Sequence, residues 1–162
     1  MIYGIIDCLQ FVNEIFAEIG QRSILENDFF QEDEMNHYGR YLKFFHNSDN
    51  LYDMYIGLIF TPYGIQIDID NIDEAVCLSC RSIRNFPKEN KELIKHIFTS
   101  YILVEQHRFC LTKFRLFNSN GDVFTTIRCL KLFCRYRKHV KLYKPIWAFS
   151  ENGNSLLFRK SE

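Results

Sequence analysis

The sequence predicts an α+β fold in which N-terminal helices pack on a mainly antiparallel, hairpin-rich sheet. Two observations predict it. Apolar residues recur at helical spacing near the N-terminus, and hairpin turn signals follow, including Asn120-Gly121 and Asn152-Gly153. The length of 162 residues fits one domain that can bury its own core. We therefore expect residues 1–162 to form a single globular domain.

Two helices are expected in the N-terminal third. The first ends at Gly20, and its apolar stripe is Ile5, Leu9, Val12, Phe16 and Ile19. The second is expected to begin near Asn27 or Asp28, because acidic residues suit the positive end of a helix dipole. Its stripe would be Met35, Tyr38, Leu42 and Phe45.

The middle of the chain predicts a hairpin and two further helices. Residues 54–60 and 65–70 flank Thr61-Pro62-Tyr63-Gly64, a sequence that favours a type I turn. Asn71 and Glu74 resemble a capping box at the start of a helix over residues 72–84. A fourth helix follows Pro87, and residues 101–104 either continue it or begin a strand.

The C-terminal third predicts antiparallel strands. Residues 109–117 and 123–134 flank the first Asn-Gly pair, and residues 141–149 and 155–159 flank the second. Apolar residues are nearly continuous in several of these strands, so we expect the helices to cover part of the sheet on both faces.

The formal net charge of zero hides two opposed halves of the sequence. Residues 1–75 carry 14 acidic and three basic side chains, whereas residues 76–162 carry six acidic and 17 basic ones. The longest run without a charge, residues 54–67, is shorter than the about 20 residues of a membrane helix. With no signal-peptide pattern, the sequence predicts a cytoplasmic protein that does not cross a membrane.

The six cysteines are expected to be free thiols. Cys77 and Cys80 have zinc-site spacing and Cys129 and Cys134 could complete four ligands, but the second pair would point to opposite faces of a strand. Hydrolase, P-loop, dinucleotide and zinc-protease motifs are absent, and His107 with Cys110 is the one Cys-His pair close in sequence. We expect no catalytic residues, no metal and no cofactor.

The densest acidic cluster is Asp68, Asp70, Asp73 and Glu74. We expect Asp68 and Asp70 to share one face of a strand, and Asp73 and Glu74 to begin a helix. Three interpretations are open: a solvated strand face with a helix start, a patch that binds a partner, and a site for a divalent metal.

A basic stretch over residues 131–144 has aromatic residues between its charges, including Phe133, Tyr136 and Tyr143. Such a pattern is typical of nucleic-acid surfaces. If it forms a strand, Arg135, Arg137, His139 and Lys141 line one face. The other interpretation is that the stretch faces solvent or the acidic half of the chain. The pI of about 6.9 is below the basicity expected of a dedicated nucleic-acid binder and argues against such a partner.

The acidic clusters over residues 28–34 and 68–74, and the segment YIGLIFTPYG from Tyr55 to Gly64, resemble those of bacterial immunity proteins from contact-dependent growth inhibition and related polymorphic toxin systems. The resemblance implies a cytosolic protein that binds a cognate toxin domain, nucleases being one class of such toxins. Complementary charge speeds an association of this kind.

The resemblance and the charge pattern together predict a partner-binding surface. Its expected residues are Asp28, Glu32, Asp33, Glu34, Asp68, Asp70, Asp73 and Glu74. Its expected aromatic anchors are Phe29, Phe30, Tyr52 and Tyr63. The rival hypothesis is a nucleic-acid-binding protein or small nuclease that uses residues 131–144.

Overall fold

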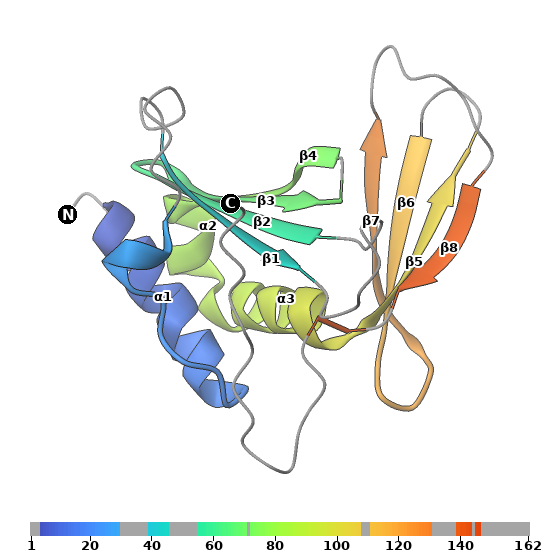
Figure 1. The fold of residues 1–162 in the computed structure, drawn as a ribbon, viewed down its shortest axis with the longest axis horizontal. Coiled ribbons are helices and arrows are strands. Elements are labelled where there is room, and N and C mark those ends of the chain that lie inside the picture. Colours follow the sequence, from blue (N-terminus) through green and yellow to red (C-terminus); the bar gives the residue numbers. More distant parts are fainter. Residues whose placement is uncertain are drawn as a thin grey trace.

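The computed structural model describes residues 4–29, 39–45, 55–70, 72–107, 111–130, 139–143 and 145–146. Over these residues the fold is α+β, as predicted, with helices and two four-stranded antiparallel sheets (Figure 1). In chain order the elements are α1 (Ile5–Glu18), the 3-10 turn η1 (Glu26–Asp28), β1 (Arg40–Phe45), β2 (Tyr55–Thr61), β3 (Gly64–Ile69), β4 (Ile72–Ser79), α2 (Cys80–Asn85), α3 (Pro87–Thr99), β5 (Tyr101–Gln106), β6 (Leu111–Phe117), β7 (Val123–Leu130) and β8 (His139–Tyr143). The strand orders are β1-β2-β3-β4 and β7-β6-β5-β8.

The first predicted helix is confirmed as α1. Its start is capped by Asp7, whose Oδ2 accepts a hydrogen bond of 3.0 Å from the Gly4 backbone N–H. Its end is set by Gly20, which adopts a left-handed φ of 73°. The buried face is Cys8, Phe11, Val12, Ile15 and Phe16.

The second predicted helix is wrong within the described residues. Asn27 and Asp28 lie in the 3-10 turn η1, and Leu42 and Phe45 lie in strand β1. Met35 and Tyr38 lie outside the described residues. The spacing of Leu42 and Phe45 also suits a helix, but Leu42 and Phe44 alternate with Tyr41 and Lys43. Pairing with β2 buries Leu42 and Phe44, so the period of two prevails.

The predicted hairpin is confirmed as β2 and β3, joined through Pro62 and Tyr63. The predicted helix over residues 72–84 is wrong for its first part, which is strand β4 paired with β3. Helix α2 begins only after Ser79, whose hydroxyl accepts a hydrogen bond of 3.1 Å from the Ser82 N–H. The side chain that caps this helix is therefore Ser79, and Glu74 lies inside β4.

Helix α3 is confirmed, and the open segment that follows it is strand β5. Only Ser100 separates the two elements. The Ser100 hydroxyl lies 2.8 Å from Nδ1 of His96, and the His96 ring stacks on Phe124 of β7 with centroids 3.7 Å apart. These contacts join α3 to the second sheet. The strands predicted over residues 109–117, 123–134 and 141–149 contain β6, β7 and part of β8, and the strand over residues 155–159 lies outside the described residues.

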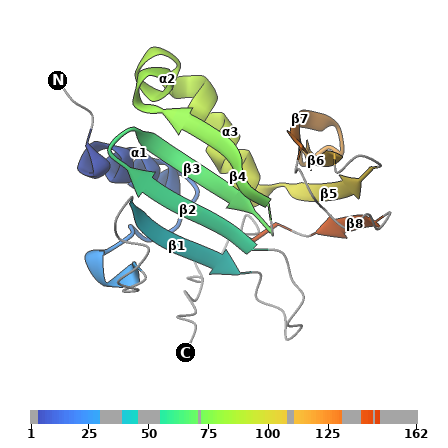
Figure 2. The ribbon, with the colours of Figure 1, turned by 90° about the horizontal axis from the view of Figure 1, so that it is seen from above.

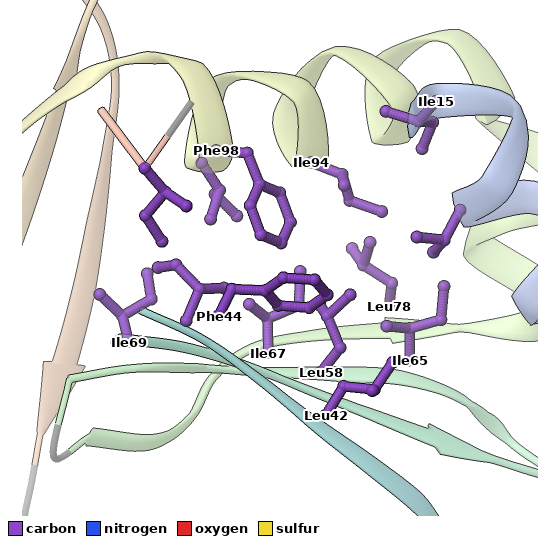
Figure 3. Packing of buried hydrophobic residues seen from close by; sticks show 14 of the residues in the cluster. Ile15, Leu42, Phe44, Leu58, Ile65, Ile67, Ile69, Leu78, Ile94 and Phe98 are labelled. Carbon is purple, nitrogen blue, oxygen red and sulfur yellow. The ribbon is translucent and has the colours of Figure 1, made fainter. Parts of the chain in front are cut away.

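The main core lies between α1, α3 and one face of the first sheet. Ile15, Ile94 and Phe98 point from the helices toward Leu58 and Ile67 of the sheet (Figure 3). The inner face of the second sheet joins the same core through Ile102, Val104, Phe114 and Leu116. None of the described helices combines the length and apolar character needed to cross a bilayer.

Candidate functional site

The outer face of the first sheet, opposite the helices, carries an unusual group of polar side chains. No described helix or strand lies over this face (Figure 2). The strand register places Lys43, Gly57 and Asp68 side by side across β1, β2 and β3. Tyr41 lies on the same face diagonally across from Gly57, and Tyr55 lies two residues before Gly57 on β2. We call Tyr41, Lys43, Tyr55 and Asp68 the Gly57 cage.

The missing side chain of Gly57 makes this cage possible. A Cβ at this position would lie 2.9 Å from Cε2 and 3.0 Å from the hydroxyl oxygen of Tyr41. It would also lie 3.1 Å from Cβ of Asp68. Glycine in the interior of a strand often marks a close approach of another group. Here that group is the Tyr41 ring, which covers the position that a side chain would occupy.

The ammonium of Lys43 lies over both tyrosine rings of the cage. Its Nζ is 5.4 Å from the centroid of Tyr41 and 4.9 Å from the centroid of Tyr55. Both distances are within the range of about 6 Å at which the negative face of an aromatic ring attracts a cation. Among the described residues, the cation over the two rings is therefore the chain's own Lys43.

Asp68 has only 4% of its surface exposed, although no described helix or strand lies over this face. The β3–β4 ladder shifts register between Ile67 and Ile69, and this irregularity brings the backbone of β4 to the carboxylate. The Glu74 N–H donates a hydrogen bond of 2.8 Å to Oδ1 of Asp68. Asp70 and Glu74 adopt positive φ values of 55° and 53°. The chain thus adopts an unfavourable backbone conformation where it supplies this bond.

The electrostatics of the cage favour neutral groups. Burial raises the pKa of Asp68, and the carboxylates of Asp73 and Glu74 raise it further. The hydrogen bond from the Glu74 N–H and the charge of the Lys43 ammonium lower it. Burial also raises the pKa of both tyrosine phenols, with Asp68 as the next cause. The ammonium of Lys43 therefore only partly offsets the negative charge gathered here.

Asp68→Asn is expected to change how stability depends on pH. The folded pKa of Asp68 lies above its unfolded value of 3.8, so the fold binds its proton more tightly than the unfolded chain does. Wild-type stability should fall as pH rises from 3.8 toward the folded pKa, and this loss should be absent in the variant. Urea unfolding of both proteins from pH 3.5 to pH 7 tests this. The free energy of unfolding of the variant should increase relative to that of the wild type as pH rises. Parallel curves would contradict it.

The structure brings half of the predicted acidic residues together. Asp68, Asp70, Asp73 and Glu74 lie in or beside the β3–β4 hairpin, next to the Gly57 cage. The expectation that Asp68 and Asp70 share a strand face, with Asp73 and Glu74 beginning a helix, is wrong. Asp70 lies in the turn after β3, and Asp73 and Glu74 belong to β4. The β3–β4 pairing decides against the helix.

The other predicted acidic residues are not placed at this site. Asp28 lies in η1, at the opposite end of the first sheet from the β3–β4 hairpin (Figures 1 and 2). Its carboxylate accepts hydrogen bonds of 2.7 and 2.8 Å from Arg22 and one of 2.7 Å from the Leu25 N–H. Asp28 is therefore engaged in holding η1. Glu32, Asp33 and Glu34 lie outside the described residues.

The expected aromatic anchors are also not gathered at the cage. Phe29 is buried in the core, where its ring meets Phe60 edge-on. Tyr63 is 83% exposed, in the turn at the other end of β3 from Asp70. Phe30 and Tyr52 lie outside the described residues.

Ion pairs between α1 and α3 account for part of the charge asymmetry. The Lys91 ammonium lies 2.8 Å from Glu14 and 3.5 Å from Glu18, and Lys95 lies 3.8 Å from Glu18. By contrast, no described basic side chain is within ion-pair distance of Asp73 or Glu74. Both of these side chains are exposed. The charge of Asp73 and Glu74 is thus directed to solvent.

The cysteines do not assemble around a shared centre in the described part. Cys77 lies on β4 and Cys80 begins α2, so their predicted placement within one helix is wrong. The thiol of Cys80 interacts with that of Cys8, where burial raises the pKa of Cys8 to about 12. Cys77 neighbours Cys129 of β7. Among the described residues, no three His, Cys, Asp or Glu side chains are placed to hold a metal ion together.

The basic stretch is described only at its end. Residues 131–138 and 144 lie outside the described residues, and His139–Tyr143 forms β8. Strand β8 pairs with β5 at one edge of the second sheet. Nζ of Lys141 lies 4.7 Å from the centroid of the Tyr143 ring.

No protein family model, curated protein or solved structure matches this chain. The site therefore has to be interpreted from its own geometry.

Three residues of the cage and the glycine beneath it were not among the predicted site residues. The helix expected to reach Phe45 placed Tyr41 and Lys43 on the wrong element, and Tyr55 was assigned no role. A usable signal was Gly57, a lone glycine within an otherwise apolar and aromatic strand.

Proposed function

We propose that the protein is an immunity protein, which binds and neutralises a cognate toxin domain through the outer face of its first sheet. The observation that supports this proposal most is the exposed pair Asp73 and Glu74, without basic partners among the described residues, beside the Gly57 cage. Exposed carboxylates without a described basic partner suit an encounter with a basic protein surface.

The partner is a domain with a basic surface, such as the substrate cleft of a nuclease. Carboxylates in such a cleft can take the place of the substrate phosphates. Electrostatic steering raises association rates by about 10- to 1,000-fold, and an inhibitor that must act before the toxin does benefits from that gain. The tyrosines of the cage supply the apolar contact area that charges alone lack.

The test needs a candidate toxin domain, which is to be sought in the neighbouring reading frames as the C-terminal domain of a large secreted protein. Cells that express this domain together with the chain should survive, and the purified pair should form a complex of one copy each. The double variant Asp73→Lys/Glu74→Lys should associate at least about tenfold more slowly at low salt, and its rate should depend less on salt concentration.

The matched control is Glu89→Lys/Asp122→Lys, which makes the same change in net charge at two exposed positions outside the hairpin. Its association rate should stay within about threefold of wild type, since steering is set by charge near the contact. Failure of the wild-type chain to protect cells, or equal slowing of both double variants, would contradict the proposal.

A further inference from the structure

We propose that the Gly57 cage is a binding site for a cationic side chain of the partner, and that Lys43 occupies it in the free protein. The proposal rests on the proposed function and specifies how its surface recognises the partner. The partner supplies a lysine or arginine side chain that replaces the Lys43 ammonium between Tyr41, Tyr55 and Asp68.

The geometry of the cage matches the requirements of a cation site. Two aromatic rings face one ammonium at 5.4 and 4.9 Å, and a carboxylate that is 4% exposed lies across Gly57 from it. Aromatic rings combined with a carboxylate are the usual means of binding alkylammonium groups. Gly57 keeps the space beneath the Tyr41 ring free of a side chain.

The present occupant is suited to exchange. Lys43 lies on β1, the outer strand of the first sheet, and its side chain is partly exposed. Its ammonium is carried by four flexible methylene groups, so leaving the rings needs only rotation of the side chain. Nζ of Lys43 has no ion pair within 4 Å among the described residues. Contacts with the rings therefore supply much of what holds it.

The charge around the cage favours an incoming cation. The carboxylates of Asp73 and Glu74 both act on the Asp68 carboxylate, and Lys43 is the one described cation that acts on it. Burial is the main cause of the raised pKa of Asp68, and these two carboxylates raise it further. A basic partner is therefore drawn to the hairpin first and then anchored at the cage, so one face serves both steering and specific contact.

The test opens the cage and offers it a small cation. Lys43→Ala is titrated with tetramethylammonium chloride, with sodium chloride at equal ionic strength as the reference, while the ring resonances of Tyr41 and Tyr55 are followed by NMR. The variant should bind the probe about two- to thirtyfold more tightly than wild type, as expected for a cation between aromatic rings. Adding Tyr55→Leu to Lys43→Ala should remove the gain.

The matched control is Lys141→Ala, which removes an ammonium from over the single ring of Tyr143. Among the described residues this ammonium faces one ring rather than two, so the affinity for the probe should stay at the wild-type level. Circular dichroism is used to check that each variant is folded. Equal affinity of wild type and Lys43→Ala, or an equal gain in Lys141→Ala, would overturn the assignment of the cage.

A second arm separates failure of the cage from failure of the proposed function. With the toxin domain, Lys43→Ala should bind at least as tightly as wild type, and Tyr55→Leu should bind at least about tenfold more weakly. Probe binding without any binding of the toxin domain would overturn the proposed function but leave the cation site. Toxin binding that is insensitive to Tyr55→Leu would overturn the cage as the anchor and leave the proposed function.

Discussion

Phe98→Ala is expected to lower the free energy of unfolding by about 3–5 kcal/mol, enough to unfold a marginally stable domain. Phe98 is fully buried on α3, and its ring meets Phe16 of α1 at 5.4 Å and Phe44 of β1 at 5.1 Å between centroids. Truncation removes the ring that packs α3 against both α1 and β1. Urea or thermal unfolding measures the loss.

The control for this substitution is Phe86→Ala, at the start of the same helix. Phe86 is 56% exposed and its side chain makes no capping hydrogen bond. Its loss should cost less than about 1 kcal/mol, as for exposed positions in general. Similar losses for the two variants would show that the three-ring contact contributes little.

Gly64→Ala is expected to destabilise the fold by about 2–6 kcal/mol, as the sum of backbone strain and overpacking. Gly64 has a φ of 151°, which residues with a Cβ rarely adopt. A Cβ there would lie 2.0 Å from the backbone oxygen of Leu78, so strand β4 would have to move away from β3. Because β4 also carries Asp73 and Glu74, the variant should weaken partner binding as well.

Gly121→Ala separates the two contributions. Gly121 has a φ of 89°, but a Cβ there would meet no atom within 4 Å. This variant should therefore show only the strain, about 1–2 kcal/mol. The two variants are compared by the midpoint of urea unfolding. Equal shifts would mean that β4 moves away from the added Cβ at position 64 without a measurable loss of stability.

The elements that the sequence predicted correctly are those with a strong local pattern. Helix α1 has an apolar stripe and a glycine stop, the β2–β3 hairpin has a turn with Pro62 and Gly64, and α3 follows Pro87. In β1 and β4 the local pattern was ambiguous. Leu42 and Phe45 fit a helix, and Asn71 with Glu74 resembles a helix start, but pairing with β2 and β3 decided otherwise. Pairing between strands therefore overrides local propensity.

The candidate site shows the same division. The hairpin carboxylates are neighbours in the chain, so their cluster was visible in the sequence. The cage joins Lys43, Gly57 and Asp68 from three strands, and its geometry depends on register. A shift of one residue would turn these side chains to the core face. The burial of Asp68 likewise depends on the β3–β4 irregularity, which has no signature in the sequence.

The arrangement of the two sheets also bears on how the protein avoids self-association. Unpaired strand edges are templates for aggregation, and two sheets have four of them. The β4 and β7 edges lie against each other, where the Cys129 thiol donates to the Ala75 carbonyl at 3.6 Å. That leaves β1 and β8 as the outer strands of the described sheets, and each carries a lysine over a tyrosine ring, Lys43 and Lys141. Lysine on an edge strand opposes pairing with a second copy. At the β1 edge, the lysine that the partner's cation would replace therefore also opposes pairing with a second copy.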